Sequence, residues 1–198
     1  MITQPLSIAV IGAGMGGLTA AATLRGIGAE VQVYEQARQF TRIGAGIQMM
    51  PNSMKVLRGI GVEPRLRELA FAPASHLNRV GDTGEVTNEL PMPEARYGAP
   101  YLCMHRATLH EALASAVPET TVQLGKRLVG LEQRDDRVEL AFADGSRAQA
   151  GAVIGADGVH STVRELLFGP DQPYNRGRVA YRGVFPASRL GGLDQAAW

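Results

Sequence analysis

A glycine-rich turn near the N-terminus is the first pattern that could do chemistry. Gly12, Gly14 and Gly17 form a GxGxxG pattern, and Glu35 follows farther along the chain. Gly12 permits a tight turn, Gly14 lets the backbone approach a pyrophosphate, and Gly17 lets a helix lie close to a strand. The N-terminus of that helix offers unpaired N–H groups and about half a unit of positive charge to phosphates. The pattern therefore predicts a site for the ADP half of a dinucleotide.

Glu35 stands where an acidic residue would bind the adenosine ribose. Its carboxylate can accept hydrogen bonds from ribose hydroxyls, and its charge disfavours the 2′-phosphate of NADP. The neighbouring segments support this, because Ser7–Ile11 is an apolar run typical of a buried strand, residues 14–28 predict a helix and Val31–Glu35 predicts a second parallel strand. The alternative is a glycine-rich turn with no ligand. These residues do not separate FAD from NAD.

A second glycine-containing turn carries a single carboxylate. A strand ends at Gly155, Asp157 and Gly158 follow in the turn, and Ser161 stands at the N-cap position of a helix predicted over 161–168. Taken alone, the segment fits a capped helix after an Asp-Gly turn as well as it fits a cofactor turn.

The remaining segments predict a mixed α/β chain interrupted by a hairpin. We expect a Rossmann-like βαβ domain with the start of a β-rich domain. The expected elements are helices at 51–60, 64–71 and 106–117, a hairpin at 77–90 around Asp82-Thr83-Gly84, strands at 121–124, 128–134 and 138–142, one strand from the Asp144-Gly145 turn to Gly155, and the opening of another sheet from Tyr174.

The order of these motifs resembles the group A FAD-dependent aromatic hydroxylases. The GxGxxG unit with Glu35, and the segment 155–164 with its Asp-Gly turn, are similar to two cofactor motifs of that family. The segment 42–52 resembles the loop that runs between the adenosine site and the flavin ring. Arg106 resembles an arginine that begins a helix near the ribityl and phosphate groups, and Val129 lies where a backbone contact to adenine would fall.

This resemblance implies FAD as the cofactor and assigns residues to it. Gln48 becomes the candidate catalytic group beside the flavin ring. Close relatives in the family have a histidine there, which can act as a base, whereas an amide can only hydrogen-bond. The candidate cofactor-binding residues are Gly12, Gly14, Gly16, Gly17, Glu35, Gln36, Arg42, Gly46, Arg106, Val129, Asp157 and Gly158.

The resemblance also implies an activity and a domain order. NADH or NADPH would reduce FAD, and a flavin C4a-hydroperoxide would transfer oxygen from O₂ to a small aromatic acid of the hydroxybenzoate or hydroxypyridine type. A third family motif, Gly-Asp followed by Ala-Ala-His-Pro, is absent. We therefore expect an N-terminal half with a p-hydroxybenzoate hydroxylase-like fold: an FAD-binding domain at 1–72 and 101–172, a hairpin insertion of the substrate domain at 73–100, and the start of a truncated substrate domain at 173–198.

Two alternatives to the hydroxylase remain at this point. One is an FAD-binding fragment without catalytic activity, and the other is an FAD oxidoreductase of the same fold that acts on a non-aromatic substrate. The absent third motif favours the first alternative for this chain alone, and the similarity of segment 48–52 to the hydroxylases argues against the second.

The amino-acid composition restricts the kinds of binding partner that we expect. The chain has 20 basic and 19 acidic residues, which are interspersed, so neither a nucleic-acid nor a membrane partner is expected. Cys103 is the single cysteine and is expected in the core, no Cys/His cluster has metal-ligand spacing, and the four histidines are expected at surface or capping positions. No basic n-region or cleavage site begins the chain, so we expect a cytoplasmic protein that is a monomer or a homodimer.

Overall fold

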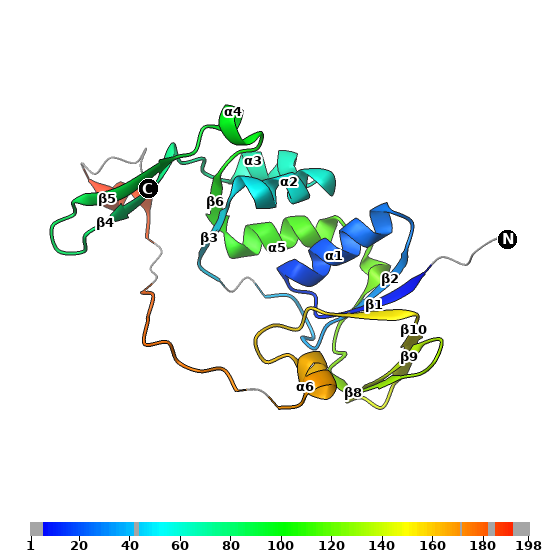
Figure 1. The fold of residues 1–198 in the computed structure, drawn as a ribbon. Helices are drawn as coiled ribbons and strands as arrows, with labels where there is room; N and C mark the ends of the chain where they lie inside the picture. The colour runs from blue at the N-terminus through cyan, green and yellow to red at the C-terminus, as the bar shows by residue number, and fades with distance from the viewer. Residues whose placement is uncertain (1–5, 42–43, 171, 182–184, 192–198) are drawn as a thin grey trace. The chain divides into compact units, whose positions relative to one another are not determined.

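The computed structural model describes residues 6–41, 44–170, 172–181 and 185–191. Contacts group the chain into two compact units. Unit 1 consists of Met1–Arg42 and His110–Val179, and unit 2 consists of Ile43–Leu109 and Ala180–Trp198. Unit 1 holds a parallel sheet, and unit 2 holds two antiparallel strand pairs (Figure 1). The domain boundaries predicted at 72, 100 and 172 remain predictions.

A four-stranded parallel sheet forms the centre of unit 1. Its order is β11 (Ala152–Gly155), β1 (Ser7–Ile11), β2 (Glu30–Tyr34) and β7 (Val122–Gln123). The central strand β1 is apolar and almost fully buried, as expected for a parallel strand covered on both faces. Helix α1 (Met15–Gly26) connects β1 to β2 and packs on both strands (Figure 1). The predicted βαβ unit is confirmed.

A three-stranded antiparallel sheet completes unit 1. It consists of β8 (Leu128–Gln133), β9 (Val138–Phe142) and β10 (Arg147–Ala150), with β9 in the middle. Helix α6 (Thr162–Phe168) packs against β8. The rings of Tyr34 and Phe142 lie 4.7 Å apart between centroids. One apolar cluster therefore joins the two sheets, and it includes Ile11, Tyr34, Leu128, Leu140, Phe142 and Val163.

The single strand predicted between the Asp144-Gly145 turn and Gly155 is wrong. The structure has two strands there, because β10 pairs antiparallel with β9 whereas β11 pairs parallel with β1. Gly151 separates them, and its N–H donates to the Ser7 carbonyl at 2.9 Å. One straight strand cannot serve both partners, so the chain changes sheets at this glycine.

Unit 2 contains two antiparallel strand pairs and short helices. Strand β3 (Gly46–Met49) pairs with β6 (Leu102–His105), and β4 (Ser75–Arg79) pairs with β5 (Val86–Pro91) as the predicted hairpin. The predicted helices at 51–60, 64–71 and 106–117 correspond to α2 (Pro51–Gly59), α3 (Glu63–Leu69) and α5 (Arg106–Ser115), the last of which extends into unit 1. The β3–β6 pair and α4 (Glu94–Tyr97) were not predicted.

The prediction that another sheet begins at Tyr174 is wrong for the described part of this region. Residues 172–181 and 185–191 contain no strand, and their one regular element is the 3-10 turn at Ala187–Leu190. The other 3-10 turn in the described part of the chain, Glu119–Thr121, lies in unit 1 just before β7. Among the described residues, no helix is both long and apolar enough to cross a membrane.

A buried carboxylate at the start of α3 ties together three segments of unit 2. Glu63 is only 5% exposed, and Arg58 donates to both of its oxygens, at 2.6 and 3.0 Å. Arg67 donates from Nε to the same carboxylate at 2.8 Å and also bonds Glu94 of α4. Hydrogen bonding to Arg58 holds the pKa of Glu63 below its usual value.

Replacing Glu63 with Gln should destabilise the protein. The variant keeps the shape but loses the charge that two arginines share, so we expect the thermal midpoint at pH 7 to fall by about 3–8 °C. Because the folded-state pKa of Glu63 is lowered, its contribution is present above the unfolded value of about 4.3 and is lost as the pH falls through the folded pKa. The midpoint difference between the two proteins should therefore shrink in acid.

The exposed partner provides a matched control for this prediction. Glu94→Gln also removes an arginine-bound carboxylate, but the Glu94 side chain is 45% exposed, so the loss should be smaller. Equal midpoints for wild type and Glu63→Gln at pH 7 would contradict a stabilising role for the buried charge.

Candidate functional site

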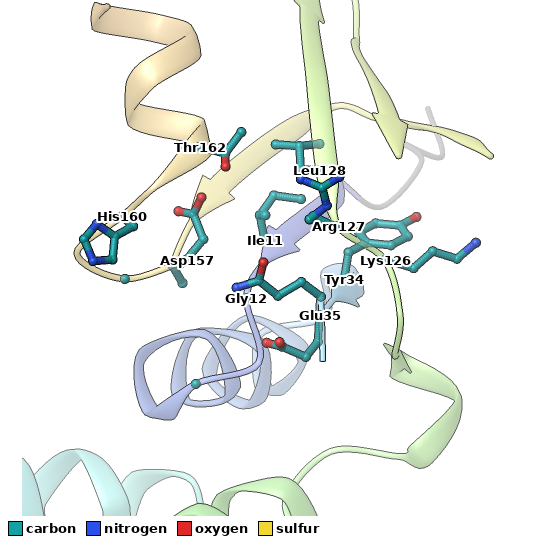
Figure 2. Close-up of a pocket in the computed structure, with 14 residues that line it drawn as sticks. Ile11, Gly12, Tyr34, Glu35, Lys126, Arg127, Leu128, Asp157, His160 and Thr162 are labelled. Carbon is teal, nitrogen blue, oxygen red and sulfur yellow. The ribbon is translucent and has the colours of Figure 1, made fainter. Parts of the chain in front are cut away.

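A cavity of about 220 Å³ lies at the carboxyl ends of β1, β2 and β11 in unit 1 (Figure 2). Open parallel sheets bind ligands just outside the carboxyl ends of their strands. The site lies at the point in the sheet where the order of the strands reverses. The structure brings six of the predicted cofactor residues to its walls: Gly12, Gly14, Glu35, Gln36, Asp157 and Gly158. These six residues thus line one cavity although they come from three separate segments.

Close backbone contacts explain two of the glycines. Gly12 has a φ of +101°, and a Cβ atom there would lie 2.5 Å from the Ala156 carbonyl oxygen. A Cβ atom on Gly17 would lie 1.9 Å from the Gly12 carbonyl oxygen. Gly14 differs, because a Cβ atom there would meet nothing within 4 Å. Gly12 and Gly17 are thus required by the protein itself, whereas Gly14 leaves space at the cavity wall.

The N-terminus of α1 is open toward an incoming anion. Gly14 is the N-cap residue, no side chain caps the helix, and the first turn carries no acidic residue. The first N–H groups of an α-helix have no partner within the helix, and the helix dipole adds positive potential at this end. A pyrophosphate group matches both properties.

Glu35 joins the end of β2 to the glycine turn. Its Oε2 accepts a hydrogen bond from the Ala13 N–H at 2.8 Å, and its Oε1 accepts one from the Ala37 N–H at 2.8 Å. Each carboxylate oxygen has two lone pairs, so capacity remains for hydroxyl donors from a ligand. The side chain is half-buried and lies at the cavity wall (Figure 2). Glu35 therefore holds the loop as well as facing the cavity.

Asp157 fixes the second turn. Ser161 donates from Oγ to Asp157 Oδ1 at 2.6 Å, and the Val163 N–H donates to Oδ2 at 3.1 Å. Ser161 Oγ in turn accepts the Arg164 N–H at 3.0 Å, so it caps α6 as predicted. The motif is compatible both with a helix cap and with a cofactor turn, because the turn that caps α6 also lines the cavity.

Several residues at the cavity were not predicted from the sequence. Tyr34, Lys126, Arg127, His160 and Thr162 also line it. The two basic residues follow strand β7 after a short turn, and residues just beyond the carboxyl ends of parallel strands form the binding crevice. This rule could have predicted Lys126 and Arg127 from the sequence. His160, expected at a surface or cap, is exposed and lies on the loop of Asp157 (Figure 2).

The ammonium group of Lys126 is already bound by two neighbouring side chains. Its Nζ donates to Asp144 Oδ2 at 2.7 Å and to Ser146 Oγ at 2.8 Å. Hydrogen bonding to Lys126 and Ser146 lowers the pKa of Asp144 well below its usual range. Arg127 lines the same wall of the cavity and is exposed.

Three of the predicted cofactor residues in unit 1 do not line the cavity. Gly16 and Gly17 are in the first turn of α1, behind Gly14. Val129 lies at a register shift in β8, between the paired positions Leu128–Phe142 and Gly130–Ala141. Its neighbour Leu128 lines the cavity, so the bulge lies beside the site. The predicted contact of Val129 with adenine remains a prediction.

The flavin-side candidates belong to unit 2. Gly46 and Gln48 line a second cavity of about 640 Å³ together with Cys103, which stands directly opposite Gln48 in the β3–β6 ladder. Cys103 is half-buried rather than fully in the core, and burial raises the pKa of its thiol. Arg106 begins α5, and its N–H donates to the Ala45 carbonyl at 3.0 Å. Arg42 lies outside the described residues.

A parallel sheet with a glycine turn, an open helix N-terminus and a carboxylate at the end of the second strand defines a dinucleotide-binding α/β domain. Comparison with known families makes this specific. Residues 6–175 match the family described as FAD binding domain, and the chain belongs to that family.

Curated relatives and solved structures agree with this assignment. The chain is 44% identical over 192 residues to 6-hydroxynicotinate 3-monooxygenase of Pseudomonas fluorescens, covering 96% of this chain and 50% of the relative. It is 41% identical to 3-amino-4-hydroxybenzoate 2-monooxygenase of Streptomyces cremeus, covering 95% and 48%. The chain spans about half the length of these relatives.

The fold is shared with solved flavoprotein structures. Klebsiella pneumoniae HpxO complexed with FAD and uric acid matches with a TM-score of 0.70 at 31% identity, over 80% of this chain and 41% of that one. The 2,6-dihydroxypyridine-3-hydroxylase of Arthrobacter nicotinovorans matches with a TM-score of 0.70 at 33% identity, over 85% and 41%. The predicted fold class is thereby confirmed.

Substitution of Gly17 by Ala should disturb the cavity through the backbone. The added methyl group would overlap the Gly12 carbonyl oxygen, so we expect a stability loss of about 1–3 kcal/mol in urea unfolding, together with weaker FAD binding. Gly26→Ala, at the other end of α1, meets nothing within 4 Å and should be neutral or stabilising. Equal stability of the Gly17 and Gly26 variants would contradict the close contact.

Proposed function

We propose that this chain is the cofactor-binding part of an FAD-dependent, NAD(P)H-using monooxygenase that hydroxylates a small aromatic acid of the hydroxybenzoate or hydroxypyridine type. The observation that carries the proposal is the cavity between the glycine turn, Glu35 and the Asp157 turn, in a chain 44% identical to a 6-hydroxynicotinate 3-monooxygenase. FAD, when bound, accepts electrons from the nicotinamide donor and activates O₂.

The cavity residues fit the ADP half of FAD. The open N-terminus of α1 would receive the pyrophosphate, and the missing side chain at Gly14 leaves room for it. Glu35 would accept the ribose hydroxyls with the lone pairs left over from Ala13 and Ala37. The Asp157 turn would form the opposite wall, where its capping hydrogen bonds keep the backbone of Gly158 in place.

The names of the relatives support an aromatic substrate. Two relatives that cover most of this chain act on a hydroxynicotinate and an aminohydroxybenzoate according to their names, and a structural neighbour is a dihydroxypyridine hydroxylase. Each name combines an aromatic ring with an electron-donating hydroxyl group. Insertion of one oxygen atom of O₂ requires two electrons to reduce the other atom to water, which is the reason for proposing a nicotinamide donor.

Gln48 is the candidate catalytic group for this reaction. Its exposed amide lies on β3 at the edge of the second cavity, where it could hydrogen-bond to a ring substituent. An amide does not change its protonation state near neutral pH, so its contribution would be orientation rather than proton transfer. Arg106 and Arg42 would offset the negative charge of the cofactor.

Glu35→Ala should weaken FAD binding by about 10–100-fold, because hydrogen bonds to a charged acceptor and one anchor of the glycine turn are lost together. Flavin fluorescence titration of the purified protein measures this affinity. Glu30→Ala, an exposed change at the start of the same strand, serves as the matched control and should retain wild-type affinity. Unchanged affinity in the Glu35 variant would remove this residue from the ribose role.

Gln48→Ala should lower kcat/KM for the aromatic substrate by roughly tenfold while FAD affinity stays constant, because one substrate hydrogen bond is lost. The assay is substrate-dependent NAD(P)H oxidation by the full-length enzyme against a panel of hydroxybenzoates and hydroxypyridines. Asn88→Ala, an exposed amide on β5, is the control. A panel that elicits no turnover from flavin-loaded wild-type enzyme would count against the proposed substrate class.

A further inference from the structure

His110 contacts the glycine turn from helix α5. Its Nε2 lies 2.8 Å from the carbonyl oxygen of Ala13, and both residues belong to unit 1. A carbonyl oxygen can only accept, so Nε2 carries the proton in this hydrogen bond. The imidazole ring is half-buried and packs edge-on against Phe40, with the two ring centroids 4.7 Å apart. From the sequence, this histidine was expected at a surface or capping position.

The Ala13 backbone is buried and needs both of its partners. Ala13 is 1% exposed, and buried backbone groups without hydrogen bonds are costly. Its N–H donates to Glu35 Oε2, and its carbonyl accepts from His110. Two side chains, from different elements, therefore fix the same residue of the turn from opposite ends.

The hydrogen bond to Ala13 also sets the direction of the next N–H group. The Ala13 carbonyl and the Gly14 N–H belong to one peptide unit, and in a trans peptide they point in opposite directions. Because His110 draws the carbonyl toward α5, the Gly14 N–H is turned to the other side of the turn. Gly14 lines the cavity and is the N-cap residue of the uncapped helix α1.

We propose that His110 is a positioning residue for the pyrophosphate of the bound dinucleotide. It acts through the Ala13–Gly14 peptide, which it orients so that a backbone donor faces the phosphate oxygens. A peptide without this anchor could rotate and present its carbonyl oxygen, which would repel the phosphate. This inference rests on the proposed function only in requiring that the cavity bind FAD, and it adds a residue whose side chain does not line that cavity.

Two substitutions of His110 separate the contribution of its N–H donor from that of its aromatic ring. His110→Gln keeps an N–H donor at about the reach of Nε2, whereas His110→Leu fills the space without a donor, and both lose the ring contact with Phe40. We expect FAD and ADP affinities to fall about fivefold to tenfold in His110→Leu and to stay within about twofold of wild type in His110→Gln. If the leucine variant does not fold, His110→Met provides the same comparison.

Spectroscopy gives a readout that a purely structural role would not move. The ³¹P resonances of bound FAD should shift in His110→Leu and remain at their wild-type positions in His110→Gln, because only the first loses the peptide orientation. Thermal unfolding of both variants without FAD measures any general loss of stability, to which their common loss of the Phe40 contact contributes equally.

The possible outcomes are distinct. Equal affinities and equal ³¹P spectra in the two variants, with FAD still bound by the wild type, would overturn the role of His110 and leave the cofactor assignment intact. Failure of the folded wild-type protein to bind either FAD or ADP would overturn the cofactor assignment, and the role of His110 with it. Selective loss in the leucine variant, rescued by glutamine, supports the proposal.

Discussion

Two backbone loops meet in close contact at the carboxyl ends of β1 and β11, and the architecture of the cavity depends on that contact. The loop after β1 can approach the Ala156 carbonyl only because Gly12 has no side chain. Gly17 then lets α1 begin immediately above the same turn. Any side chain at either position would separate the two loops or lift the helix, and the helix N-terminus would no longer face the cavity. Steric exclusion, rather than any single attraction, thus sets the geometry of the site.

The polar groups around this contact already form hydrogen bonds within the protein. Glu35 accepts hydrogen bonds from two backbone N–H groups, Asp157 accepts one from the N-cap residue of α6, and Lys126 is paired with Asp144. Hydrogen bonds made before a ligand arrives reduce the ordering that binding would otherwise require. The first N–H groups of α1, which no side chain caps, stay open to a ligand. A site of this kind presents fixed dipoles to the phosphates and relies little on mobile charged side chains.

Local patterns were sufficient to predict the βαβ unit, the hairpin and the capped helix α6, because each depends on residues close together in sequence. The glycine spacing, Glu35 and the Ser161 cap all belong to this kind. The β3–β6 pair was missed because its two short strands are far apart in sequence and neither has a strong period. The break at Gly151 was missed because strand propensity does not reveal which partner a strand takes. His110 was missed for the same reason, since its partner Ala13 is remote in the chain.

The single residue between β10 and β11 also limits where this domain can change length. Strand side chains alternate between faces, so one inserted residue at Gly151 would reverse the faces of β11 or displace its register with β1, and the Asp157 turn would move with it. The turn between β8 and β9 is different, because residues 134–137 are exposed and the Arg134 N–H closes the hairpin on the Arg137 carbonyl. Extra residues there would only extend the hairpin into solvent. Insertions among homologous domains should therefore collect at 134–137 and avoid 150–152, and the same turn is the position to choose for grafting a tag or a reporter peptide.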